Sequence, residues 1–247
     1  MDGVPVIALL VIVLLAVIVL LVIVLLDRLR RREPPPRDPE LLGKTIVVLS
    51  DTHGSHREIE VPDADIFIHA GDFTRFGNEE DAVDFNEWLG SLPHKTKIVV
   101  EGNHEANAPW KARTGAILSN ATFLRNEGTT AEGVTIWGKG FFWNMKSHNP
   151  YDDLIPAATD VLVAHNPARG FCDGGQGCEE SAALCGRLRP RVYICGHIHH
   201  AKGVAQGTGR CASTVFVNGA SVLGDHKAKK HEASAYTLNG KPEVIRI

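Results

Sequence analysis

Short apolar segments recur along the chain from Thr45 onward, and each is followed by a polar or glycine-containing loop. Continuous runs of β-branched and aliphatic residues are typical of strands that are covered on both faces. Asp81–Leu92 differs, because Ala82, Phe85 and Leu89 repeat at helical spacing and predict a helix with one apolar face. The predicted strands are Ile46–Leu49, Ile66–Ile68, Ile98–Val100, Val161–Val163, Val192–Cys195, Val134–Trp137, Thr214–Val217, Glu243–Arg246 and Ala233–Leu238. Strands interleaved with helices predict an α/β fold, a layered β-sandwich flanked by helices.

The N-terminal part has a different pattern. Val6–Leu26 is an unbroken apolar run, and as a helix it is about 31 Å long, the thickness of a bilayer core. The acidic leader Met1–Gly3 and the arginines at 28, 30, 31 and 32 argue against a cleaved signal peptide, which needs a basic leader. Because basic residues prefer the cytoplasmic side, we expect a single-pass membrane protein with the domain that follows in the cytosol. The predicted division is a short N-terminus (1–5), a transmembrane anchor (6–26), a basic and proline-rich linker (27–43) and one domain (44–247).

Composition narrows the class of protein further. The chain has 247 residues and a formal net charge of −3, so it lacks the basic field that attracts long nucleic acid. The five cysteines are odd in number and form no CxxC pair, which argues against a disulfide framework or a cysteine zinc site. Reduced thiols fit a cytosolic setting better.

Side chains that bind metals follow several of the predicted strands. Loops converge at the carboxyl ends of strands in α/β sheets, so these side chains are expected to meet there. A lone Gly-Asp is common in turns and a lone histidine is often structural, but the joint pattern supplies enough ligands for two ions. Mixed nitrogen and oxygen donors favour Mn, Fe, Zn or Ni over Mg or Ca. The candidate ligands are Asp51, His53, Asp72, Asn103, His165, His197 and His199.

The order of these motifs resembles that of the calcineurin-like metallophosphoesterase superfamily, in particular its small metallophosphoesterase-domain-containing proteins. The resemblance covers about Thr45 to Val222. It rests on Ser50–Gly54, Glu60–Asp65, His69–Thr74, Phe85–Gly90, Gly102–Glu105, Gly196–His199 and Val217–Val222. It implies that Asp51, His53, Asp72 and His199 hold a first metal and that Asp72, Asn103, His165 and His197 hold a second. It further implies that His104 is not a ligand, but contacts phosphate together with Asn103 and protonates the leaving group.

The activity expected from this resemblance is hydrolysis of a phosphoester by two divalent ions. A water between two such ions has a pKa of about 7, so it supplies a hydroxide that attacks phosphorus while His104 protonates the leaving alkoxide. The resemblance favours a phosphodiesterase acting on small or cyclic nucleotide-type substrates. A phosphomonoesterase or protein phosphatase, and a non-catalytic membrane-anchored scaffold that keeps the fold, remain as alternatives.

Three further residues and one loop are expected near the candidate ligands. The family usually has Gly and then Pro-Pro after the histidine at 165, whereas this chain has Asn166, so the loop is expected to shape a different substrate pocket. His200 is interpreted as a solvated residue or as a partner of the metal ligands. His69 is interpreted as supporting the site without binding metal. Three glycines in Gly170–Gly177 predict a mobile loop near His165.

Overall fold

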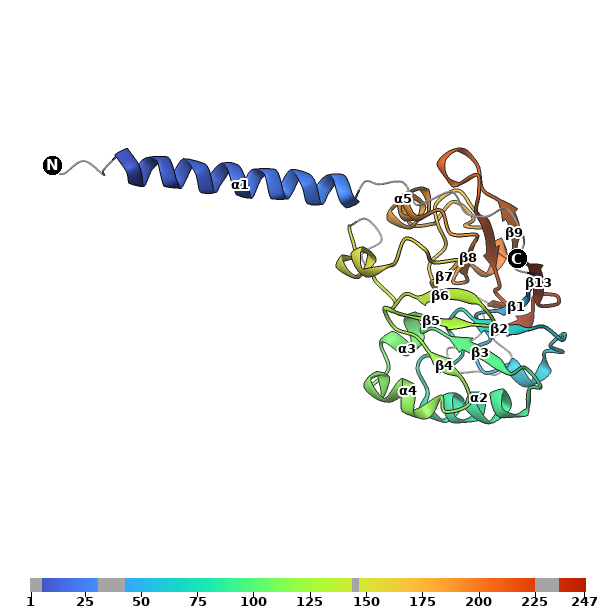
Figure 1. Ribbon diagram of the computed structural model, residues 1–247. Helices are drawn as coiled ribbons and strands as arrows, with labels where there is room; N and C mark the ends of the chain where they lie inside the picture. Colours follow the sequence, from blue (N-terminus) through green and yellow to red (C-terminus); the bar gives the residue numbers. More distant parts are fainter. Residues whose placement is uncertain (1–5, 31–42, 144–146, 225–235) are drawn as a thin grey trace. The chain divides into compact units, whose positions relative to one another are not determined.

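The computed structural model describes residues 6–30, 43–143, 147–224 and 236–247. The chain divides into two units, Met1–Pro35 and Pro36–Ile247, each described by itself. The first unit contains the helix α1 (Val6–Arg30), which continues past the end of the apolar run (Figure 1).

The predicted membrane anchor at 6–26 and the single-pass location are wrong. Of the described residues, none belongs to a helix long and apolar enough to cross a membrane.

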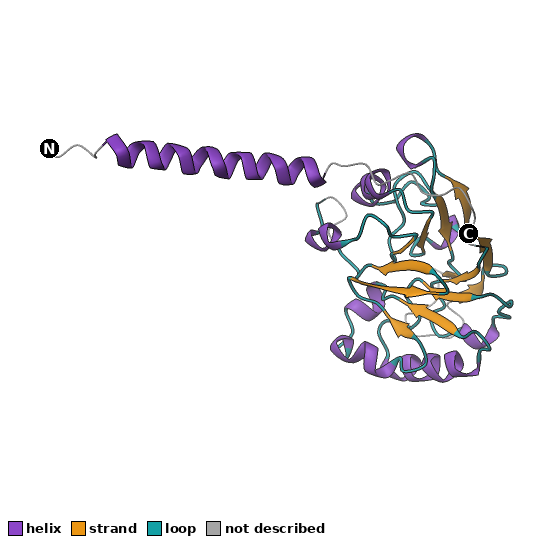
Figure 2. Ribbon diagram, viewed as in Figure 1, coloured by secondary structure: helices purple, strands orange, loops and turns teal. Residues whose placement is uncertain are grey.

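The second unit is built on two mixed sheets, drawn as orange arrows in Figure 2. In the first sheet β1 to β4 run parallel and β13 is antiparallel to β1. In the second sheet β6, β7, β8 and β10 run parallel, with β5 and β9 antiparallel at the two edges. The spatial order of the first sheet is β13 (Glu243–Arg246), β1 (Thr45–Leu49), β2 (Ile66–His69), β3 (Thr96–Val99) and β4 (Thr122–Phe123). That of the second is β5 (Glu127–Ala131), β6 (Val134–Gly138), β7 (Val161–Val163), β8 (Val192–Cys195), β10 (Val215–Asn218) and β9 (Gly203–Gln206). A separate pair joins β11 (Val222–Gly224) to β12 (Tyr236–Leu238).

Alternation of side chains along the strands produces four layers. Ile46 and Val48 of β1 pack with Val161 and Ile194 in the core between the two sheets. The intervening residues of the first sheet, such as Val47, point to the opposite face and pack against helix α2. Leu162 and Tyr193 of the second sheet likewise pack against helix α5. Because successive strand residues face opposite sides, continuous apolar runs are what a sheet covered on both faces requires.

The helices lie on the outer faces of the sandwich (Figure 1). Asn78 caps α2 by accepting a hydrogen bond from the Glu80 amide, and Phe85 and Leu89 form its buried face. The α-helices of this unit are α2 (Glu79–Ser91), α3 (Asn103–Ala106), α4 (Thr114–Ile117) and α5 (Glu179–Leu188). Short 3₁₀ helices are η1 (His56–Glu58), η2 (Lys111–Arg113), η3 (Pro150–Leu154), η4 (His199–Ala201) and η5 (Gly209–Cys211).

The predicted α/β sandwich is confirmed, and most predicted elements lie within two residues of the observed ones. Val161–Val163, Val192–Cys195 and Glu243–Arg246 are strands with the predicted bounds. The segment predicted at Ala233–Leu238 is a strand from Tyr236, and residues 233–235 lie outside the described residues.

Candidate metal centre

The predicted ligands lie where the parallel strands of both sheets end. Asp51 and His53 follow β1, and Asp72 follows β2. Leu49 pairs with His69, which pairs in turn with Val99, so β1, β2 and β3 end side by side. Asn103 opens α3 after β3, His165 follows β7, and His197 and His199 follow β8.

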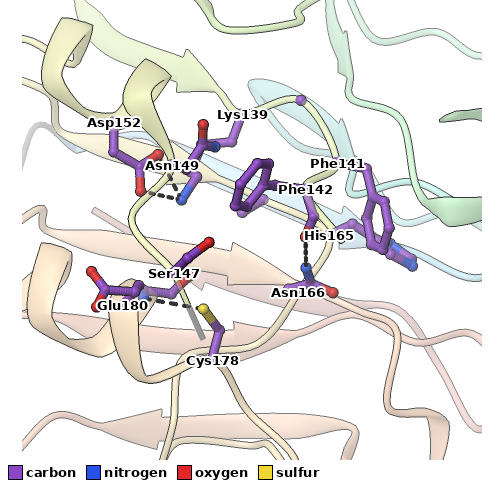
Figure 3. Close-up of a pocket in the computed structure, with 13 residues that line it drawn as sticks. Lys139, Phe141, Phe142, Ser147, Asn149, Asp152, His165, Asn166, Cys178 and Glu180 are labelled. Carbon is purple, nitrogen blue, oxygen red and sulfur yellow. Dashed lines mark hydrogen bonds and ion pairs between the residues drawn. The ribbon is translucent and has the colours of Figure 1, made fainter. Parts of the chain in front are cut away.

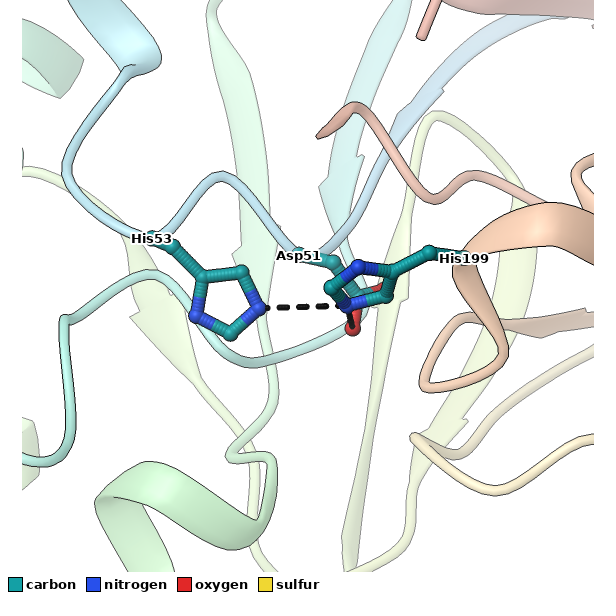
Figure 4. A group of neighbouring side chains, drawn as sticks. All are labelled: Asp51, His53 and His199. Atoms are coloured by element: carbon teal, nitrogen blue, oxygen red, sulfur yellow. Dashed lines mark hydrogen bonds and ion pairs between the residues drawn. The ribbon is translucent and has the colours of Figure 1, made fainter. Parts of the chain in front are cut away.

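One group of possible ligands joins the two sheets. Asp51, His53 and His199 each offer one ligand atom, and these atoms lie within 4.8 Å of one another (Figure 4). His199 Nε2 is 3.2 Å from Asp51 Oδ1 and 3.2 Å from His53 Nε2. A carboxylate oxygen and two imidazole nitrogens at this spacing match the donor types of a transition-metal site.

Two further groups are linked to the first, one through His53 and the other in turn through Asp72. Asp72, His165 and His197 offer ligand atoms within 4.8 Å of one another, as do His53, Asp72 and His104. Asp72 therefore belongs to two groups, and its Oδ2 atom is 3.2 Å from His165 Nε2. The structure brings six of the seven predicted ligands into one cluster, with His104 beside them.

Asn103 is the remaining predicted ligand. The amide of the next residue, His104, donates to Asp72 Oδ1 at 2.9 Å, which holds the start of α3 against the cluster. Asn103 Oδ1 is buried and, among the described residues, has no hydrogen-bond partner. Buried polar atoms are nearly always paired, so an unpaired amide oxygen beside this cluster fits a centre that binds cations.

Hydrogen bonds fix which nitrogen of two histidines faces the cluster. His165 Nδ1 lies 2.8 Å from the carbonyl of Ala70, and His53 Nδ1 lies 3.2 Å from the carbonyl of Thr74. A carbonyl only accepts, so each Nδ1 carries a proton and each Nε2 faces the cluster. This arrangement is the usual one for metal-binding histidines.

The electrostatics of the cluster also favour a cation. Asp51 and Asp72 are both buried, which raises their pKa, but the nearby His165 outweighs burial and holds both pKa values below the usual range. Burial lowers the pKa of His165, yet Asp72 and Asp51 outweigh it and raise that pKa to about 10. Two buried carboxylates thus require positive charge nearby. Burial lowers the pKa of His53 and of His197 to about 4, which keeps both rings neutral and able to ligate.

Four of the candidate ligands have a left-handed backbone. The φ angles are 51° at Asp51, 43° at His53, 55° at Asp72 and 69° at His197. Such conformations cost on the order of 1–3 kcal/mol each and cluster at functional sites, where the surrounding structure enforces them. Here the amide of Asp51 donates to Gly71 O and the amide of His53 donates to Asp72 O, so the two loops hold each other.

Two glycines allow the backbone to approach the buried carboxylates. A Cβ atom on Gly102 would lie 2.1 Å from Asp72 Oδ1, and one on Gly196 would lie 2.1 Å from Asp51 Oδ2. No side chain fits at either position without moving a candidate ligand. The glycines of the Gly-Asn-His-Glu and Gly-His-Ile-His segments are therefore part of the geometry of the site.

Sequence reasoning missed the part played by Glu105. This buried carboxylate accepts hydrogen bonds from the amides of Asp72, Thr74 and Gly102 and from the Thr74 hydroxyl. Burial, with a contribution from Asp72, raises the pKa of Glu105 to about 7. The signal in the sequence was the position of Glu105 three residues after Gly102, the spacing of an N-terminal capping box.

His69 supports the centre from behind, as interpreted from the sequence. The amide of Gly71 donates to His69 Nδ1 at 3.3 Å, so the ring proton lies on Nε2 and is donated to Thr52 Oγ1 at 3.1 Å. Burial lowers the pKa of His69 to about 3. The neutral ring thus links the loop after β1 to the loop after β2.

Asn166 lines a small cavity that His165 also borders (Figure 3). Its Nδ2 donates to the Phe142 carbonyl, and its Oδ1 is buried without a partner. Lys139 and Asp152 form a buried ion pair of 2.9 Å at the same cavity. The volume of about 20 Å³ suits one ordered water rather than a substrate group.

Hydrogen bonds hold the glycine-containing loop at 170–177 in place, whereas a mobile loop was expected. Asp173 accepts hydrogen bonds from the amides of Gly170, Gly175 and Gly177. Asn218 Nδ2 donates to the carbonyl of Cys172 in the same loop.

Comparison with known proteins gives the family. The family model described as calcineurin-like phosphoesterase matches residues 44–201. The chain belongs to the calcineurin-like phosphoesterase family. Metallophosphoesterase domain-containing protein 1 of Homo sapiens is 33% identical over 230 residues, covering 75% of this chain and 69% of the relative. A UPF0046 protein of Caenorhabditis elegans is 34% identical over 203 residues, covering 71% of this chain and 69% of the relative.

A solved structure supports the fold of this calcineurin-like phosphoesterase. The protein TT1561 of Thermus thermophilus superimposes with a TM-score of 0.52 at 15% sequence identity. The match covers 71% of this chain and 88% of that one. Membership of the family confirms the recognition made from the motifs, and it agrees with a hydrolase that uses divalent metals.

Proposed function

We propose that this phosphoesterase is a dinuclear metal-dependent phosphodiesterase acting on small or cyclic nucleotide-type substrates. The observation that carries the proposal is the set of three interlocking ligand groups, in which Asp72 and His53 are each shared by two groups. An arrangement with a shared carboxylate suits two adjacent ions, because each carboxylate oxygen accepts independently.

The ligand assignment remains that of the sequence analysis. The first ion would be held by Asp51, His53, Asp72 and His199 and the second by Asp72, Asn103, His165 and His197. When bound, two such ions polarise the phosphoryl group and lower the pKa of a coordinated water. Their identity among Mn, Fe, Zn and Ni is set by affinity and supply, since the donor set suits all four.

His104 is assigned to phosphate contact and proton donation. Its Nε2 lies 3.8 Å from Asp72 Oδ2, so the ring borders the centre, and its side chain is partly exposed. The other nitrogen, Nδ1, lies 3.1 Å from the Thr74 carbonyl and 2.8 Å from the Phe76 amide. These two partners correspond to two states of the ring.

The protonation of Nδ1 bears on whether Nε2 transfers a proton or only donates a hydrogen bond. When both ring nitrogens are protonated, Nδ1 donates to the Thr74 carbonyl and Nε2 can release its proton to a leaving alkoxide. An unprotonated Nδ1 accepts from the Phe76 amide, and the neutral ring then only donates a hydrogen bond from Nε2 to phosphate. Both partners lie at Nδ1, so Nε2 is the nitrogen on the side of the centre.

A panel of phosphoesters tests the proposal. The purified protein, with Mn added, is assayed with bis-p-nitrophenyl phosphate, p-nitrophenyl phosphate and 2′,3′- and 3′,5′-cyclic nucleotides. We expect hydrolysis of the diesters, its loss on chelation and its recovery on reloading. Faster turnover of the monoester would favour a phosphomonoesterase. Two bound metals without hydrolysis of any substrate would favour a scaffold and overturn the proposal.

A further inference from the structure

An open groove begins at the second pair of histidine ligands. It is bordered by His197 and His199 on one side and by Gln176, His200 and Leu223 beyond them. Its volume of about 310 Å³ falls at the lower end of the range for small-molecule sites, about 300–1,000 Å³. The cavity beside Asn166 holds no more than a water, whereas this groove is a space next to the centre that can take part of a substrate.

The walls of the groove are fixed by a buried asparagine. Asn218 Nδ2 donates to the Cys172 carbonyl at 3.0 Å and to the Ile198 carbonyl at 3.0 Å. The first bond holds the loop that carries Gln176, and the second holds the residue between the two histidine ligands. Asn218 itself is fully buried, so both walls are set before any ligand arrives.

Gln176 and His200 present polar side chains to the groove that do not hold the fold together. Within the part of the chain that the structure describes, neither Gln176 nor His200 forms a side-chain hydrogen bond or ion pair. The His200 ring lies directly over Gly174, where a Cβ atom would be 2.4 Å from its Nε2. The exposed Leu223 adds an apolar surface. Gln176 and His200 offer hydrogen bonds at an edge, and Leu223 offers contact with a ring face.

We propose that this groove binds the non-reacting ester substituent of a phosphodiester, and that Gln176 and His200 contact it. The inference rests on the proposed phosphodiesterase function and adds where the second substituent lies. An aromatic or heterocyclic group with polar edge atoms, such as a nucleoside base, matches the mixture of amide, imidazole and aliphatic side chains.

The position of His104 agrees with this assignment. His104 contacts the group around His53 and Asp72 and stacks on Phe76, with ring centroids 5.1 Å apart. It is not among the residues that border the groove. The leaving group, which receives the proton, therefore lies toward His104, and the retained substituent lies toward His200. A monoester has no retained substituent, so the groove distinguishes diesters from monoesters.

Two diesters with one leaving group test the groove. Methyl p-nitrophenyl phosphate and bis-p-nitrophenyl phosphate both release p-nitrophenolate, but only the second has a large retained group. The ratio of their kcat/KM values measures the contribution of that group. We expect His200→Ala and Gln176→Ala each to lower the ratio about five- to tenfold, the usual effect of one hydrogen bond. Gln206→Ala, in β9 and outside the groove, is a control for the loss of a glutamine side chain elsewhere. An unchanged ratio in both groove variants would overturn the inference.

A pair of glycine variants tests whether the position of the His200 ring matters when the side chain itself is kept. Gly174→Ala places a Cβ against the His200 ring, whereas Gly175→Ala adds one at a similarly left-handed position with nothing within 4 Å. We expect Gly174→Ala to lower the ratio as His200→Ala does, and Gly175→Ala to leave it as in the wild type. Equal effects of the two substitutions would count against the groove.

A binding measurement tests the groove independently of whether the protein hydrolyses an ester. Calorimetry compares diphenyl phosphate with inorganic phosphate on the metal-loaded protein. We expect His200→Ala to weaken diphenyl phosphate about fivefold relative to phosphate. If the wild type hydrolyses no ester but this selective loss occurs, the activity proposal fails and the groove stands. Equal weakening of both ligands would refute the groove.

Discussion

Glu105 accepts a hydrogen bond from the Asp72 amide at 2.8 Å, and the Gly102 amide donates to the same Glu105 oxygen at 3.0 Å. One buried carboxylate therefore fixes the carboxylate that two ligand groups share. Since Asp72 has a left-handed backbone, the hydrogen bond holds the residue in a conformation that it would not adopt alone.

Replacing Glu105 by glutamine should weaken metal binding although every candidate ligand is kept. The amide nitrogen would face backbone donors that need an acceptor, which costs about 1–3 kcal/mol per unsatisfied group. We expect Glu105→Gln to lower the melting temperature and to weaken binding of both metals. Calorimetry and metal analysis measure the two effects. The exposed Glu60→Gln is the control and should behave as the wild type.

Asp72→Ala should weaken both metal sites at once. Its carboxylate belongs to two of the three ligand groups, so removing it takes a donor from each ion. Elemental analysis after dialysis should show well below two metals per chain. Full retention of two metals would contradict the shared role of Asp72.

His104→Ala should keep the metals and lose rate. We expect kcat to fall about 10²-fold or more with a poor leaving group, the usual contribution of a general acid. The loss should shrink with p-nitrophenolate, which leaves without protonation. An equal loss for good and poor leaving groups would show that His104 only contacts phosphate, in the state bonded to the Phe76 amide. His148→Ala, at an exposed histidine, serves as the control.

Gly196→Ala should disrupt the centre through steric contact alone. The added Cβ would lie 2.0 Å from Ser50 Oγ and 2.1 Å from Asp51 Oδ2, so Asp51 has to move. We expect loss of metal binding and a destabilisation of about 1–3 kcal/mol, typical of overpacking. In Gly115→Ala the nearest atom is 3.7 Å away, so this variant should bind metal normally. Normal metal content in Gly196→Ala would contradict the close approach.

The buried His69 predicts a pH dependence of stability. Its pKa is lowered to about 3 in the folded protein, against about 6.5 in an unfolded chain. Below pH 6.5 the unfolded chain binds a proton that native His69 does not accept, so this contribution to stability is complete above pH 6.5. It decreases as the pH falls toward 3, by up to about 1.4 kcal/mol per pH unit. Urea unfolding of the wild type and of His69→Gln should show a shallower slope in the variant.

The sequence predicted the strands of the core well because they are covered on both faces. Val161–Val163 and Val192–Cys195 are continuous apolar runs, which no other local structure explains as simply. The edge strand Glu127–Ala131 was missed, because it is largely exposed and polar and is defined by its pairing with β6.

The candidate ligands were predictable because their types and order carry the chemistry. Their support was not predictable, since it depends on contacts between residues far apart in the chain. Asn218 reaches Cys172 across 46 positions and Glu105 reaches Asp72 across 33. The N-terminal anchor was predicted from hydropathy and flanking charge, and among the described residues no helix is long and apolar enough to cross a membrane.

The two sheets contribute different halves of the metal centre. Asp51, His53, Asp72 and Asn103 come from loops of the first sheet, and His165, His197 and His199 come from the second. An ion bound between them would link the loops of the two sheets to each other. Ligand binding to the native state adds stability of about 2.7 kcal/mol at a concentration of 100 times Kd. Chelation should therefore lower the stability of the domain, because it removes a contact that joins its two halves.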